Sequence, residues 1–254
     1  MRYRTPCGGG GKIPEHGEKV KLRLWTYGFW RQGTVLDLFA GMGCLSEEYA
    51  KAGCERLICV EKEEEYYDVL REMMKPYRNV ELYLEDNMDF LDGEVVAVTS
   101  ITYVDFDAFG CPNQQIVKFF EKYPIRQTIM VNVTDGTLLN LNRLATIDLG
   151  EYYLINLFQR GYLSRRDFDS KRNLRRLLPW LQREFIHILA AKHSFSTSFV
   201  YHAMNREANV MYYAFIAYPE AETSLWATGM MPMIRFRKDE SSQIKTLRKV
   251  KLRK

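Results

Sequence analysis

The chain has 254 residues, of which 46% are hydrophobic and 27% charged, the usual proportions for a globular protein of one large domain or two small ones. It contains no run of 18 apolar residues and no apolar segment after its basic N-terminus, so we expect neither a transmembrane helix nor a secretory signal, and we predict a cytoplasmic protein. The net charge of +4 is unevenly distributed, because residues 160–193 hold nine Lys and Arg against three Asp and Glu, and residues 235–254 hold nine against two.

The first 33 residues are interpreted as an N-terminal arm. Residues 1–18 are rich in Gly and Pro and predict a loop. Residues 19–31 are ambiguous, because Val20, Leu22 and Leu24 alternate as in a strand, whereas Val20, Leu24 and Tyr27 fit one face of a helix.

From residue 34 onward, short apolar strands alternate with helical segments. Strands are predicted at 34–40, 56–61, 80–85, within 95–104, and at 128–134, and helices at 45–52, 63–75 and 113–122. This alternation is typical of an α/β fold with a doubly wound, mostly parallel sheet covered on both faces. We assign residues 34–150 to this core.

After Gly150 the composition changes, and residues 151–193 predict a basic helical insertion. Four arginines spaced 7, 4 and 7 residues apart share a face away from an apolar stripe: Arg165, Arg172, Arg176 and Arg183. Pro179 is predicted to start a second helix. Two strands, 195–202 and 208–218, are expected to form a hairpin within residues 194–234, and residues 235–254 form a basic tail, either flexible or folding on binding.

The two basic segments on a mildly acidic body suggest a polyanionic partner such as nucleic acid, and no membrane partner is expected. The alternative is a solvated helix face with a solubilising tail. Nothing in the pattern indicates an oligomeric state.

The stretch V-L-D-L-F-A-G-M-G-C-L-S, residues 35–46, predicts a buried strand that ends in a glycine turn before a helix. Glycine at such a turn lets the backbone approach a ligand closely. Acids then recur at or beside the ends of successive strands, namely Asp37, Glu61, Asp86 and Asp105. Because the carboxyl ends of parallel strands meet at one edge, these acids predict a ligand crevice, with Glu61 suited to two ribose hydroxyls and Asp86 to an adenine amino group. The alternative is that the acids simply cap the following helices.

Residues 35 to about 134 resemble the class I S-adenosylmethionine-dependent methyltransferases. The resemblance implies a seven-stranded sheet whose last strand is antiparallel, and S-adenosyl-L-methionine as cofactor. It places Asp37, Gly41 and Gly43 at the methionine end, Glu61 at the ribose and Asp86 at the adenine. The adjoining Phe39 and Asn87 are included in this predicted cofactor set, together with Lys12 and Asp105.

The stretch Y-V-D-F-D-A-F-G-C-P, residues 103–112, places two carboxylates at the end of an apolar run. A carboxylate that accepts a hydrogen bond or a proton from an exocyclic base amine raises the reactivity of its nitrogen. A neighbouring aromatic ring can stack on a base taken out of its helix. Asp107 and Phe109 supply these two groups, with Gly110 and Pro112 keeping the loop tight.

This stretch is similar to the D-x-D-P-F-G-S-P segment of the tRNA guanine N2-dimethyltransferases, and I-M-V-N-V-T-D-G (129–136) to a V-T-x-T-D segment of that family. The resemblance implies that Asp107 is the catalytic acid/base, that Asp105 supports it or touches the cofactor, and that Phe109 packs on the base. Ala108 replaces the proline of that segment, and the large C-terminal domain of the family is missing or replaced by residues 151–193.

Other classes remain open. R-T-P-C-G-G-G-G-K, residues 4–12, resembles the arm of some DNA adenine methyltransferases, although D-A-F-G replaces their D-P-P-Y, and the alternative is a plain flexible terminus. In either case Lys12 is predicted to line the cofactor pocket. Cys111 suggests cytosine C5 methylation, which requires a thiolate nucleophile. That chemistry expects the order P-C in this loop, whereas the order here is C-P. No C-x-x-C pair and no metal-ligand spacing of histidines occurs, so no metal is expected.

We therefore predict an S-adenosylmethionine-dependent nucleic-acid methyltransferase acting on an exocyclic base amine, with guanine N2 of tRNA or another structured RNA as the favoured target. The four arginines would bind phosphates. The alternatives are DNA adenine N6 methylation, a small-molecule methyltransferase, and a non-catalytic nucleic-acid-binding partner.

Overall fold

The computed structural model describes residues 14–29, 33–93, 95, 98, 100–139, 171–204 and 210–220. Their helices are α1 (Pro14–Tyr27), α2 (Cys44–Lys51), α3 (Glu64–Met74), α4 (Asn87–Asp92), α5 (Asn113–Lys122) and α9 (Lys171–Lys192). Their strands are β1 (Thr34–Asp37), β2 (Arg56–Glu61), β3 (Val80–Leu84), β4 (Ile101–Asp107), β5 (Ile129–Asp135), β6 (Phe195–Met204) and β7 (Met211–Pro219).

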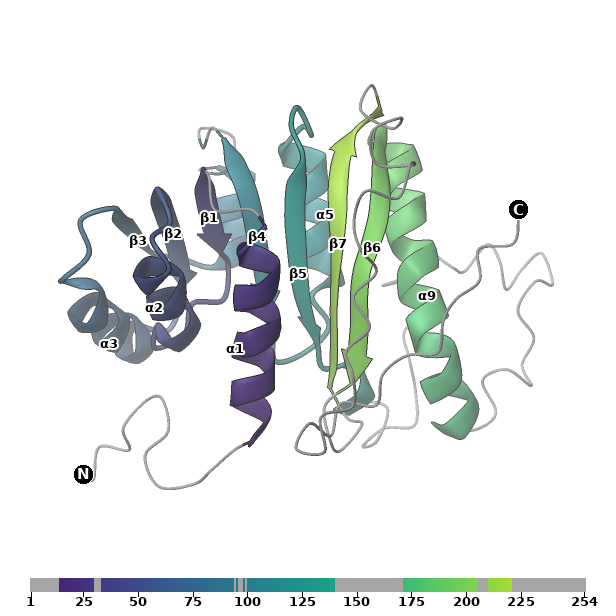
Figure 1. Cartoon of the computed structure of the whole chain (residues 1–254), viewed down its shortest axis with the longest axis horizontal. Helices are drawn as coiled ribbons and strands as arrows, with labels where there is room; N and C mark the ends of the chain where they lie inside the picture. The colour runs from purple at the N-terminus through teal and green to yellow at the C-terminus, as the bar shows by residue number, and fades with distance from the viewer. Residues whose placement is uncertain are drawn as a thin grey trace.

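The strands form a seven-stranded sheet in the order β3-β2-β1-β4-β5-β7-β6. Neighbours from β3 to β5 pair in parallel, whereas β7 runs antiparallel to both β5 and β6. Figure 1 shows α1 and α2 on one side of the sheet and α5 on the other. The predicted doubly wound α/β fold, with the last strand antiparallel, is confirmed.

Each face of the sheet packs on its own set of helices. Buried side chains of α1, α2 and α3 share one apolar cluster with Tyr103 of β4, and those of α4, α5 and α9 share the other with Val104 and Phe106. This division follows from the alternation of side chains along a strand. Asp105 and Asp107 therefore lie on the Tyr103 face, beneath α1.

Strand β4 differs from its prediction at its carboxyl end. It begins at Ile101 and continues through Asp107, so the two aspartates are part of the strand rather than the start of a loop. The apolar pattern stopped the prediction at Val104 because a carboxylate is costly to bury. Cations of α1 neutralise these carboxylates and allow the strand to continue.

The ambiguous segment after residue 19 is a helix, and α1 starts earlier, at Pro14, inside the stretch predicted to be a loop. Proline suits the first helical turn because it needs no donor there. Leu22 and Tyr27 of this helix are buried in the core. Part of the predicted arm therefore belongs to the packed domain.

The prediction that Pro179 starts a second helix is wrong, because α9 is continuous from Lys171 to Lys192 with Pro179 inside it. A proline in mid-helix removes one backbone hydrogen bond and destabilises the helix. Leu174, Leu178 and Phe185, on both sides of the proline, are buried against the sheet. This tertiary packing keeps the helix continuous.

Among the described residues, none of the helices combines the length and the apolar character that a membrane span requires.

Candidate functional site

The glycine turn after β1 is held by Asp37. Its carboxylate accepts hydrogen bonds from the Ser46 hydroxyl (2.7 Å) and from the Phe39 backbone amide (3.3 Å), and the side chain is buried. Burial, and then the negative charge of Asp105, raise the pKa of Asp37 to about 7. Gly41 and Gly43 both have positive φ, 55° and 89°, which an L side chain rarely adopts.

Glu61 lies beside this turn, as predicted. Its carboxylate accepts the backbone amide of Gly41 at 2.7 Å and that of Glu63 at 2.8 Å, and thereby ties the turn to the end of β2. Both oxygens keep a further lone pair. A Cβ built on Gly41 would meet no atom within 4 Å, so the space next to the turn is open.

Asp86 and Asn87 follow β3. Asp86 accepts the Met88 amide at 2.8 Å and is the N-cap of α4, so the capping interpretation holds for this acid. Its second oxygen lies 3.7 Å from the Lys62 ammonium, and the side chain stays partly exposed. Asn87 contacts the Leu38 carbonyl oxygen (3.4 Å) and Gln115 (3.2 Å), linking this edge to β1 and α5.

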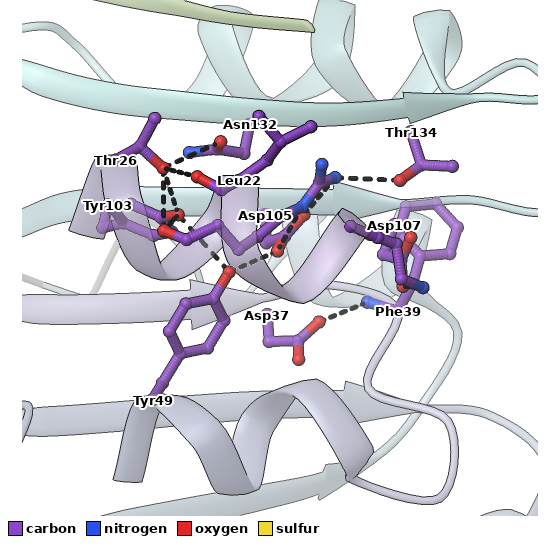
Figure 2. A network of polar contacts seen from close by, with 12 residues as sticks. Leu22, Thr26, Asp37, Phe39, Tyr49, Tyr103, Asp105, Asp107, Asn132 and Thr134 are labelled. Atoms are coloured by element: carbon purple, nitrogen blue, oxygen red, sulfur yellow. Dashed lines mark hydrogen bonds and ion pairs between the residues drawn. The ribbon is translucent and has the colours of Figure 1, made fainter. Parts of the chain in front are cut away.

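Asp105 is the centre of a buried polar network (Figure 2). Arg23 of α1 donates to both carboxylate oxygens, at 3.2 and 3.1 Å, and to the Thr134 hydroxyl at 2.8 Å. Tyr49 of α2 donates to the same carboxylate at 2.5 Å. Arg23 and Asp105 have no exposed side-chain surface. The carboxylate therefore lies beneath α1 and joins the helix to the sheet.

A second cluster extends the network toward the start of β4. The Thr26 hydroxyl lies 2.9 Å from the Tyr103 hydroxyl and 3.1 Å from the Asn132 side-chain oxygen. The Tyr103 hydroxyl donates to the Arg23 backbone carbonyl at 2.9 Å. Helix α1 is thus attached to β4 and β5 by polar contacts as well as by apolar packing.

Asp107 lies at the carboxyl end of β4, and Lys19 of α1 donates to it at 2.6 Å. The two side chains are 15% and 16% exposed, so this pair lies at the border of the solvent. Burial alone would raise the pKa of Asp107, but the charges of Lys19 and Arg23 outweigh it and lower this pKa below its ordinary value.

Phe109 projects from the loop that follows β4, and 97% of its side chain is exposed. The backbone of this loop is held by the segment that follows β5. The Gly136 amide donates to the Gly110 carbonyl at 2.9 Å, and a Cβ on Gly136 would come within 2.4 Å of the Phe109 carbonyl oxygen. The segment after β5 therefore supports the loop through backbone contacts that require glycine.

The predicted site residues fall into three groups. Asp37, Glu61 and Asp107 end β1, β2 and β4 at one edge of the sheet, Asp86 follows β3 at the same edge, and Gly41 and Gly43 lie between Asp37 and Glu61 in the chain. Asp105 lies two residues before Asp107 in β4 and is fully buried. Lys12 and Arg165 lie outside the described residues. Among the described residues, no group of three or more His, Cys, Asp or Glu could hold a metal ion.

The predicted arginine face is only partly solvent-exposed. Arg172 and Arg176 are exposed on α9. The Arg183 guanidinium instead lies over the Phe199 ring, 5.1 Å from its centroid, and burial lowers its pKa. Arg183 is therefore packed against the sheet rather than presented to solvent.

Lys19 and Arg23 of α1 are site residues that the sequence pattern did not indicate. Their spacing of four residues places them one helical turn apart, and the spacing of two between Asp105 and Asp107 places those on one face of a strand. These two spacings were a signal. The spacing of Lys19 and Arg23 could not be used from the sequence alone, because residues 19–31 fitted a strand as well as a helix.

Comparison with known proteins identifies the fold. No family model matches the chain. Over 79 residues the chain is 39% identical to the ribosomal RNA small subunit methyltransferase A of Thermotoga petrophila, a match that covers 30% of this chain and only 30% of that relative. Trm1 from Pyrococcus horikoshii, solved in complex with S-adenosyl-L-methionine, is 12% identical, with 87% of this chain and 59% of that chain covered, at a TM-score of 0.60. The chain therefore has the fold of the class I S-adenosylmethionine-dependent methyltransferases.

Proposed function

We propose that the chain is an S-adenosylmethionine-dependent methyltransferase that acts on an exocyclic amine of a nucleic-acid base. The fold, the S-adenosyl-L-methionine in the Trm1 structure and the partial identity to a ribosomal RNA methyltransferase support this class of reaction. Gly41 and Gly43 would border the cofactor, and the free lone pairs of Glu61 and Asp86 would bind its ribose and adenine. The open space beside Gly41 fits such a ligand.

The observation that carries the acceptor proposal is the pairing of Asp107 with Phe109. An almost fully exposed aromatic ring lies two residues after a carboxylate at the predicted ligand edge of the sheet. An apolar ring of this kind has no packing role in the described protein, but it offers a surface on which a planar base can stack. Asp107 would then accept an N–H of the amine of the stacked base.

In the transfer, bound S-adenosylmethionine would supply a methyl group, whose bond to sulfur breaks with its electron pair left on sulfur as the amine nitrogen attacks. Asp107 orients the amine by accepting one N–H, and it takes the proton that the methylated nitrogen releases before passing it to water. Phe109 fixes the plane of the base. Alignment of nitrogen and methyl carbon is the main contribution of the protein.

RNA is the proposed substrate, and guanine N2 the proposed acceptor. The ribosomal RNA relative supports RNA, and the likeness of residues 105–112 to the tRNA guanine N2-dimethyltransferases supports that amine. The exposed Arg172 and Arg176 would contact phosphates without reading sequence. Methylated adenine in duplex DNA would instead favour the DNA adenine N6 alternative, and transfer to none of the nucleic acids would favour a small-molecule acceptor.

The test is transfer of labelled methyl groups to tRNA, ribosomal RNA and duplex DNA, followed by analysis of the nucleosides. Asp107→Asn should reduce the transfer rate by about 10²-fold or more, the typical contribution of a positioned acid or base. Calorimetry should find its affinity for S-adenosylmethionine nearly unchanged. Asp89→Asn, an exposed acid on α4, is the matched control. Full activity of the Asp107 variant would refute the proposal.

A further inference from the structure

Lys19 is the side chain of α1 that contacts the acceptor carboxylate. Its ammonium lies 2.6 Å from one oxygen of Asp107, and both side chains are about five-sixths covered. An ion pair with this little exposure is screened less by solvent and salt than a surface pair.

The position of Lys19 is set by the rest of its helix. Arg23, one turn further along, is fixed by Asp105 and Thr134, and Thr26 is fixed by Tyr103 and Asn132. These contacts are buried, so the helix cannot rotate without breaking them. These contacts consequently fix the position of Lys19 over the carboxyl end of β4.

We propose that Lys19 is a positioning residue of the acceptor site, which keeps the Asp107 carboxylate ionised and oriented until the substrate amine binds it. This inference rests on the proposed role of Asp107. In its ionised form the carboxylate accepts hydrogen bonds only, which is what an amine N–H requires. If Asp107 were protonated, one of its oxygens would carry an O–H group, and the hydrogen of this group cannot accept the N–H of the amine.

Other charged and titratable groups also face Asp107. Arg23 of α1 adds positive charge, and Asp37 of β1 and Asp105 of β4 add negative charge when ionised. Thr134 of β5 contributes a hydrogen bond, and Tyr201 of β6 lies close enough to interact. Lys19 is the cation in direct contact, so its removal should raise the pKa of Asp107.

Two measurements on the full chain test the inference. The first is an NMR titration of the Asp107 carboxyl carbon in the free protein, which needs no substrate. The second is the pH profile of kcat/KM for methyl transfer to the best RNA substrate. The variants are Lys19→Met, Lys19→Arg, which keeps the charge, and Lys21→Met, an exposed lysine on the same helix.

In Lys19→Met, the Asp107 titration and the acidic limb of the kcat/KM profile should both move to higher pH. Its activity relative to wild type should be near one at high pH and should fall as the pH falls. Lys19→Arg should restore the wild-type midpoint, and Lys21→Met should never move it. An unmoved Asp107 titration, or a loss of activity that is the same at every pH, overturns the inference. A shifted titration without any methyl transfer would instead point to a failure of the proposed function.

Discussion

Arg23 and Asp105 form a two-point ion pair in which neither side chain is exposed to solvent. The pair joins α1 to the middle of β4. Such a pair is weak evidence for stability as a whole, because desolvation offsets the attraction, but removing one partner leaves the other charge buried and alone.

Asp105→Asn should therefore lower the free energy of unfolding by about 3–5 kcal/mol. Arg56 and Glu81 offer a matched control, since they have the same two-point geometry, at 2.6 and 2.8 Å, but are 36% and 42% exposed. Glu81→Gln should cost less than about 1 kcal/mol. Urea unfolding measures both. Equal losses in the two variants would contradict the assignment of Asp105 to the scaffold.

Asp37 should give the stability of the protein a pH dependence. Its pKa is about 7 in the fold against an ordinary value of 3.8, so the folded state binds the extra proton between these values. The contribution of Asp37 to the free energy of unfolding should therefore be fully present at low pH and fall by a few kcal/mol as the pH rises through this window. Asp37→Asn should remove that slope, whereas the exposed Asp89→Asn should retain it. The comparison requires denaturant unfolding at several pH values, and an unchanged slope in Asp37→Asn would argue against a buried, neutral Asp37.

Gly136→Ala should displace the loop that carries Phe109. The new Cβ would meet the Phe109 carbonyl oxygen at 2.4 Å, a backbone atom that can move only if the loop moves. Because methyl transfer depends on alignment, we expect kcat to fall by about 10²-fold with cofactor affinity retained. Gly110→Ala lies in the same loop, where a Cβ would meet nothing within 4 Å, and it should stay close to wild type. Similar kcat values for the two variants would show that the backbone contact does not matter.

Arg172→Gln combined with Arg176→Gln should weaken RNA binding and reduce its dependence on salt. Each lost phosphate contact should lower the slope of log K against log salt by about 0.7–0.9. Arg71→Gln with Arg78→Gln removes the same charge from the region of α3, at the opposite end of the sheet in Figure 1, and should leave the slope unchanged. Filter binding at several salt concentrations distinguishes the pairs. An unchanged slope in the α9 variant would exclude a phosphate contact there.

The fold and the outline of the site were predictable because they depend on periodicity. Alternating strands and helices predicted the sheet, and the acids at the ends of β1 and β2 and after β3 do lie at one edge. The end of β4 was mispredicted because a local pattern treats Asp105 as a charge facing water. Its partner Arg23 is 82 residues away in the chain, and only the tertiary fold brings the two together. The continuous α9 was missed for the same reason, since buried contacts on both sides of Pro179 outweigh its local preference.

The two ion pairs of α1 also fix how far the helix can slide along the sheet. Four helical residues advance about 6 Å and two strand residues about 6.6 Å, so Lys19 and Arg23 match Asp107 and Asp105 step for step. A slip by one turn would place Arg23 opposite Asp107 and leave Asp105 facing Thr26 and Tyr27, without any cation. Because an unpaired buried charge is costly, the slipped arrangement is unfavourable. The matched spacings of Lys19 and Arg23 on the helix and of Asp105 and Asp107 on the strand therefore fix the position of α1 along the sheet.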